Sequence, residues 1–115
     1  MPVLYHNPRC SKSRQAALLC ADSPLDIEIH HYLSQPLDFD TLHSMLTRLD
    51  GDVGESVRWK DNGLKLIDTT NVDRGNIESI ARFLAEHGQF MQRPWLDDGT
   101  ITVIGRPVER LNRLL

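Results

Sequence analysis

Cys10 is the residue of this chain best placed to do chemistry. It follows a short apolar stretch, residues 2–5, and a turn that contains Pro8, and it precedes a helix-like run, residues 11–21. We therefore expect Cys10 where a loop becomes the first turn of a helix. Unpaired backbone N–H groups and the helix dipole there favour a thiolate over a thiol. The sequence predicts a nucleophilic cysteine with a lowered pKa.

Basic side chains surround this cysteine in the sequence, and positive charge stabilises a thiolate. They are His6, Arg9, Lys12 and Arg14. Two alternatives stay open for His6: it supports the thiolate, or it is an ordinary histidine at the end of a strand. Asn7 is expected to shape the turn, although its amide could also reach the thiolate or a bound oxyanion.

Ser13 completes a Cys-x-x-Ser element with Cys10. Its hydroxyl could donate a hydrogen bond to the thiolate, but it cannot resolve a mixed disulfide as a second cysteine would. A cycle based on one cysteine needs an outside thiol, most simply glutathione. Cys20 lies ten residues further on among alanines and leucines. About 15 Å of helix rise separates it from Cys10, so we expect a small core residue there.

Three arginines are candidates for binding an oxyanion beside Cys10, because a guanidinium offers paired N–H donors to an anion. Arg93 and Arg106 each precede a proline, and Arg58 lies in a Ser-Val-Arg-Trp-Lys segment. A proline directly before a strand, such as Pro94, is commonly cis in a thioredoxin-like fold and faces the active cysteine. The remaining arginines considered are expected to be solvated surface charges: Arg48, Arg74, Arg82, Arg110 and Arg113.

Composition limits the class of protein. With 115 residues and a net charge of −3, we expect one domain and no general nucleic-acid binder. No apolar run approaches membrane-spanning length, so we expect neither a membrane partner nor a signal peptide. Two cysteines imply no disulfide scaffold and favour the cytoplasm. The scattered histidines give no metal-ligand set, and we expect no bound cofactor.

The order of predicted elements indicates the fold class. Strands are expected at residues 3–5 and 26–32, each followed by a helix, with Asp38 capping the second helix. A strong helix is expected at 76–87, then a hairpin formed by 94–96 and 101–104, then a closing helix from Pro107. This order is that of an α/β, thioredoxin-like mixed sheet of about four strands flanked by helices. The helical insertion before the final β-hairpin spans roughly residues 38–90 of a single 1–115 domain.

The run from His6 to Arg14 closely resembles the opening of the glutaredoxin-coupled arsenate reductase family, which also includes Spx-like members. Arg58, the Arg93-Pro94 pair and the Arg106-Pro107 pair follow in matching order. The resemblance implies that Cys10 attacks arsenate, that Arg58, Arg93 and Arg106 bind the oxyanion, and that His6 supports the thiolate. It also implies that glutathione attacks the adduct and that glutaredoxin helps to release arsenite and regenerate the thiol.

Two alternatives to an arsenate reductase remain. The first is a related glutathione-dependent thiol–disulfide reductase that uses the same Cys10 on another substrate. The second is a non-enzymatic redox regulator of the Spx type, which usually carries Cys-x-x-Cys. Ser13 counts against the second alternative.

Overall fold

A four-stranded mixed sheet in the order β2-β1-β3-β4 forms the centre of the computed structural model, which describes residues 1–115. The strands are β1 (Val3–Tyr5), β2 (Glu28–His30), β3 (Trp95–Asp97) and β4 (Thr102–Ile104). β1 and β2 are parallel, whereas β1–β3 and β3–β4 are antiparallel. Leu4 of β1 lies opposite Ile29 on one side and Leu96 on the other, so β1 is a central strand.

Three α-helices and four 3-10 helices surround the sheet. They are α1 (Ser11–Asp22), α2 (Phe39–Thr47), η1 (Val53–Ser56), η2 (Asn62–Leu66), α3 (Ile77–Glu86), η3 (Gly88–Phe90) and η4 (Val108–Arg113). The α2 and α3 helices begin at capping side chains. Asp38 accepts a hydrogen bond from the Thr41 N–H, and Asn76 accepts one from the Ser79 N–H. Both caps satisfy backbone donors that would otherwise have no intrahelical partner.

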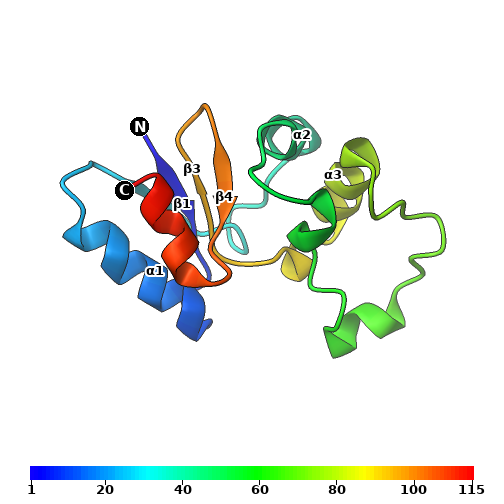
Figure 1. Ribbon diagram of the computed structural model, residues 1–115. Helices are drawn as coiled ribbons and strands as arrows, with labels where there is room; N and C mark the ends of the chain where they lie inside the picture. The colour runs from blue at the N-terminus through cyan, green and yellow to red at the C-terminus, as the bar shows by residue number, and fades with distance from the viewer.

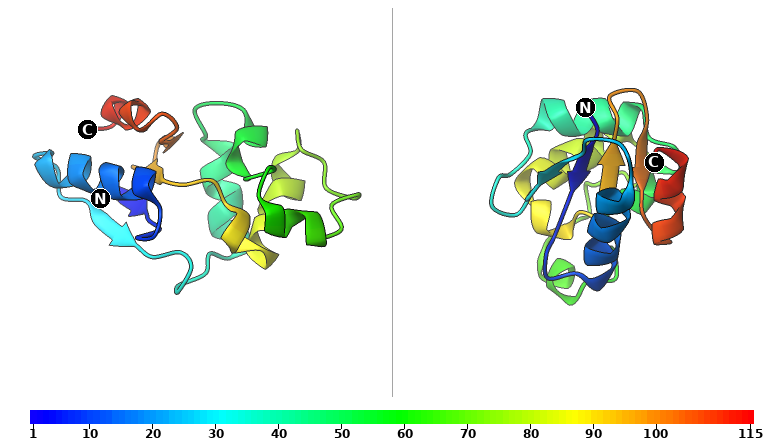
Figure 2. Two further views of the ribbon diagram at one scale, coloured as in Figure 1. Left: turned by 90° about the horizontal axis from the view of Figure 1, so that it is seen from below. Right: turned by 90° about the vertical axis from the view of Figure 1, so that its left-hand side faces the viewer.

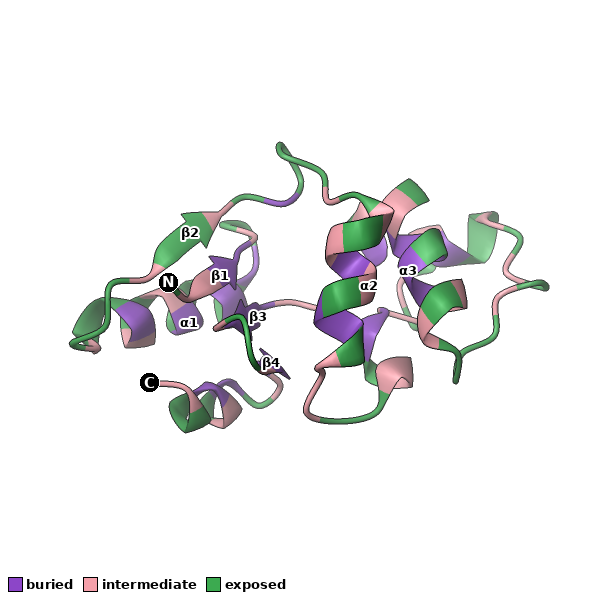
Figure 3. Ribbon diagram, turned by 90° about the horizontal axis from the view of Figure 1, so that it is seen from above, coloured by how far each residue is buried: buried purple, intermediate pink, exposed green.

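The two faces of the sheet are covered by different parts of the chain. α1 and η4 lie together on one side, whereas α2, α3 and the 3-10 helices between them extend from the other (Figures 1 and 2). Alternation along the strands explains this division, because successive side chains point to opposite faces. Leu4 packs with α1 and η4, whereas its neighbour Tyr5 packs with α2 and α3. The buried stripes of α2 and α3 face each other (Figure 3).

The predicted order of strands, helices, insertion and hairpin is confirmed, with differences at two elements. β2 is shorter than the predicted strand 26–32, because as an edge strand it pairs only with the three residues of β1. The closing element η4 is a 3-10 helix rather than an α-helix. Both Arg93-Pro94 and Arg106-Pro107 are cis. None of the helices combines the length and apolar character that a membrane crossing requires.

Candidate active site

Cys10 caps the N-terminus of α1. Its backbone is extended, its carbonyl accepts the first helical hydrogen bond from Arg14 N–H, and the residue is 7% exposed. The turn before it is closed by a Cys10 N–H to Asn7 carbonyl bond of 3.0 Å. The sulfur therefore lies where the free N–H groups of the first helical turn converge.

Arg106 and Arg93 converge on this cysteine from the far end of the chain. Arg106 Nη2 lies 3.6 Å from Cys10 Sγ, and Arg106 Nε donates to the Arg93 carbonyl at 2.8 Å. Gly105 permits this arrangement, because a Cβ there would stand 3.0 Å from both Pro94 and Leu111 side-chain carbons. The Gly105 N–H also donates to the Pro94 carbonyl at 2.8 Å. The two Arg-Pro segments thus hold each other beside the sulfur.

The surroundings of Cys10 lower the pKa of its thiol. Burial raises the pKa, but the hydrogen bond and charge of Arg93 and the backbone N–H groups of Ser13 and Lys12 more than offset that effect. Cys20 provides the contrast. It lies in the core between α1 and the sheet, and burial alone raises the pKa of its thiol. Of the two free cysteines, only Cys10 has surroundings that favour the thiolate.

His6, Ser13 and Asn7 form a hydrogen-bonded network within the segment that carries the cysteine. His6 Nδ1 lies 2.7 Å from Ser13 Oγ, and the Asn7 N–H donates to the same oxygen at 2.9 Å. Burial and the nearby His31 lower the pKa of His6, so its ring is neutral at pH 7 and adds no positive charge. The Ser13 hydroxyl is engaged with His6, and it is the Ser13 backbone N–H that acts on Cys10. The network fixes the loop that carries the sulfur.

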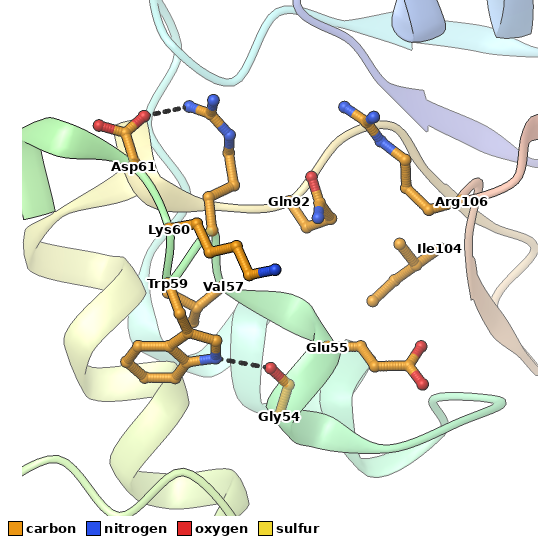
Figure 4. Close-up of a pocket in the computed structure, with 10 residues that line it drawn as sticks. Gly54, Glu55, Val57, Trp59, Lys60, Asp61, Gln92, Ile104 and Arg106 are labelled. Carbon is orange, nitrogen blue, oxygen red and sulfur yellow. Dashed lines mark hydrogen bonds and ion pairs between the residues drawn. The ribbon is translucent and has the colours of Figure 1, made fainter.

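Two other predicted residues are directed elsewhere. Arg14 donates to the Pro8 carbonyl at 3.0 Å, where it braces the turn. Arg58 Nη1 is paired with Asp61 Oδ2 at 2.6 Å. Arg58 and Arg106 line the same cleft of about 560 Å³, which also contains Lys60 and Gln92. Figure 4 shows Asp61 and Arg106 on opposite sides of this cleft, with the ion pair drawn from Asp61.

Several arginines expected to be solvated surface charges have specific partners instead. Arg48 makes a two-point ion pair with the buried Asp97, at 2.8 and 2.6 Å. Arg74 lies over the Trp59 ring at 4.0 Å. Arg110 contacts Glu55 and the Asp50 carbonyl, and Arg113 pairs with Asp50. The expectation was wrong for Arg48 and Arg110, which are half-buried because partners distant in sequence become their neighbours in the folded chain. Arg74, Arg82 and Arg113 are exposed, as expected, although each also has a partner.

A cysteine at a helix N-terminus, beside arginines on cis Arg-Pro segments of a four-stranded sheet, defines a thioredoxin-like protein with a cysteine-centred site. The comparisons identify the family within this class. The chain belongs to the ArsC family, whose model matches residues 5–114.

Individual relatives agree with this membership. The chain is 32% identical over 114 residues to the arsenate reductase of Haemophilus influenzae, covering 98% of this chain and 97% of that protein. It superposes on the arsenate reductase from Vibrio cholerae with a TM-score of 0.85 at 25% identity, covering 99% and 97% of the two chains. It is also 21% identical, over 100% of its length and 87% of the relative's, to the global transcriptional regulator Spx of Bacillus subtilis.

Proposed function

We propose that this protein reduces arsenate to arsenite through the Cys10 thiolate, with glutathione and glutaredoxin as reductants. The observation that carries the proposal is the approach of Arg106 Nη2 to within 3.6 Å of Cys10 Sγ, at the N-terminus of α1. Guanidinium and backbone N–H donors around one sulfur favour both a thiolate and a bound oxyanion. Relatives that are called arsenate reductases support arsenate as the oxyanion.

The first step is attack of the Cys10 sulfur on arsenic. A sulfur–arsenic bond forms, and one arsenate oxygen takes up protons and leaves as water. Arg93 and Arg106 stabilise the negative charge of the remaining oxygens, because they are already held beside the sulfur. No cysteine of this chain stands ready to complete the reaction, since Ser13 occupies the Cys-x-x-Cys position and Cys20 is buried in the core.

External thiols therefore supply the electrons. Over the whole cycle arsenic(V) gains two electrons and becomes arsenic(III), while two glutathione thiols become one disulfide and one water is released. Glutaredoxin takes part in resolving the glutathione-bound intermediate and returns Cys10 to the thiol. This cycle requires a reducing compartment, in line with the expected cytoplasmic location.

A coupled assay tests the proposal. NADPH oxidation is followed with arsenate, glutathione, glutaredoxin and glutathione reductase, for the native chain, Cys10→Ser and the matched control Cys20→Ala. We expect arsenate-dependent turnover in the native chain and the control, and none in Cys10→Ser. A folded native chain without arsenate-dependent turnover would refute the proposal.

The Arg58–Asp61 pair favours one alternative, a glutathione-dependent thiol–disulfide reductase, because it leaves fewer free cations for an oxyanion. Arg106→Met separates the two functions. An arsenate reductase loses arsenate turnover in this variant, whereas a disulfide reductase retains turnover of the mixed disulfide formed from glutathione and 2-hydroxyethyl disulfide. A regulator of the Spx type would turn over neither substrate.

A further inference from the structure

Tyr32 follows the C-terminal end of β2, next to the C-terminal end of β1, where the loop that carries Cys10 begins. β1 and β2 are parallel neighbours with Tyr5 opposite His30, so the chain emerges from both strands at one edge. The His6 N–H donates to the His30 carbonyl at 2.9 Å, which extends the pairing by one step. Cys10 follows β1 and Tyr32 follows β2. The topology therefore places the phenol near the cysteine.

The Tyr32 ring belongs to a buried cluster to which the segments before Arg58 and Arg93 also contribute. It is 3% exposed and belongs to the same buried cluster as Val57 and Met91, which pair with each other across an isolated bridge. Arg58 directly follows Val57, and Arg93 lies two residues after Met91. Two of the three segments that supply candidate oxyanion ligands, those of Arg58 and Arg93, thus contribute to the same buried cluster as Tyr32.

The Tyr32 hydroxyl is buried and makes no hydrogen bond of good geometry in the protein, although the Asn7 side chain lies near enough to lower its pKa. Buried polar atoms nearly always have a partner, so an exception requires an explanation. Arg93 Nε is a second buried donor without a partner. Two hydrogen-bond donors without an acceptor, beside a cysteine contacted by Arg106, are suited to an anion.

The charges that act on the phenol agree with this position. Burial raises the pKa of Tyr32; the Arg93 charge lowers it, the Cys10 thiolate raises it, and Arg58 and the Asn7 side chain lower it. These are the groups of the candidate site. Because the net effect is a raised pKa, the phenol is neutral at pH 7 and can donate a proton in a hydrogen bond without opposing an anion.

We infer that Tyr32 is a further substrate-binding residue, whose hydroxyl donates a hydrogen bond to an oxygen of the oxyanion bound at Cys10. The inference rests on the proposed function for the identity of the oxyanion. Tyr32 supplies a neutral hydrogen-bond donor from the β2 side of the site, whereas the arginines supply cationic donors. The contact persists when the oxyanion becomes attached to the sulfur, since no proton is transferred.

The test compares Tyr32→Phe with Tyr5→Phe. Tyr5 is a matched control, because it is also a buried tyrosine at the sheet, but the side chains that act on it, Asp97, Arg48 and Glu28, lie outside the candidate site. Inorganic arsenate is titrated against the rate at which iodoacetamide alkylates Cys10, measured by peptide mapping. Thermal unfolding is recorded without arsenate. We expect Tyr32→Phe to need about tenfold more arsenate for half-protection, the effect of losing a hydrogen bond to a charged group.

The melting temperature gives a readout that distinguishes binding from structure. Since the hydroxyl makes no hydrogen bond of good geometry in the protein, Tyr32→Phe should melt no lower than Tyr5→Phe. Unchanged protection in Tyr32→Phe, or a melting temperature clearly below that of the control, would overturn the inference and leave the proposed function intact. If arsenate failed to protect Cys10 of the native chain, the oxyanion site would be absent and both proposals would fall.

Discussion

Asp61 holds Arg58 in an ion pair that would have to break for Arg58 to bind the proposed oxyanion. Asp61 Oδ2 accepts from Arg58 Nη1 at 2.6 Å, while Oδ1 accepts from the Gly63 N–H at 2.8 Å and caps η2. Asp61→Asn removes the charge but retains an oxygen for the cap, and asparagine is as good an N-cap as aspartate. The variant therefore frees Arg58 with little effect on local structure.

The size of the effect follows from the exposure of the pair. The Arg58 and Asp61 side chains are 28% and 23% exposed, so the interaction is partly screened by water. An ion pair of this kind contributes about 1 kcal/mol, at the upper end of the range for surface pairs. If arsenate must displace Asp61 from Arg58 in order to bind, removing the Asp61 charge removes this competing partner and lowers the KM for arsenate about fivefold. The kcat should stay within about twofold, because Cys10, Arg93 and Arg106 are unchanged.

The assay is the coupled NADPH measurement at varied arsenate, with two controls. Asp52 caps η1 in the same way but forms no ion pair. The KM of Asp52→Asn therefore reports the general effect of removing one negative charge from this part of the chain. Arg58→Met tests the coupling: Asp61→Asn should have no further effect in that background. An unchanged or raised KM in Asp61→Asn, or the same decrease in Asp52→Asn, would refute the reasoning.

Three further predictions concern reactivity and stability. The rate at which Cys10 is alkylated, measured against pH by peptide mapping, should give an apparent pKa below the value of about 8.5 for free cysteine. Cys20 should react far more slowly. A pKa of Cys10 at or above that of free cysteine would contradict the assigned environment. Because burial lowers the pKa of His6, the unfolded chain takes up the proton first. His6 therefore contributes stability that is fully present above about pH 6.5 and is lost as the pH falls from there through the lower pKa of the folded state. Urea unfolding of the native chain and His6→Asn between pH 8 and pH 5 should show a smaller pH slope in the variant, and equal slopes would argue against a buried neutral His6. Arg48→Met should reduce the free energy of unfolding by about 3 kcal/mol, because it leaves the buried Asp97 carboxylate without its cationic partner. Arg82→Met, which removes an exposed helix pair, should cost about 0.5 kcal/mol or less, and similar losses in the two variants would contradict this account.

Local signals in the sequence were sufficient to predict most elements of the fold. The capping residues Asp38 and Asn76 begin α2 and α3, and Asp98-Gly99 forms the turn between β3 and β4, with Gly99 at φ +89°. Caps, turns and apolar periodicity act over a few residues, so they can be recognised without the rest of the chain. Of the two deviations, the short β2 lies at the edge of the sheet, where only one neighbouring strand pairs with it, and the 3-10 form of the closing helix has no local signal in the sequence.

For the candidate site too, some features could be predicted from local sequence and others could not. The sequence by itself determined the position of Cys10 at a helix N-terminus, because a strand, a turn and a helix follow one another within about a dozen residues. It also singled out the Arg-Pro pairs by their composition.

Only the tertiary structure decided how these groups are partnered. It pairs Arg58 with Asp61, directs Arg14 to the Pro8 carbonyl and joins Ser13 to His6. It also brings Tyr32, which the sequence marked only as part of a strand, to the sheet edge where the Cys10 loop begins. Charge and residue type can be read along the chain, but the partner that satisfies a buried or charged group depends on distances that packing alone sets.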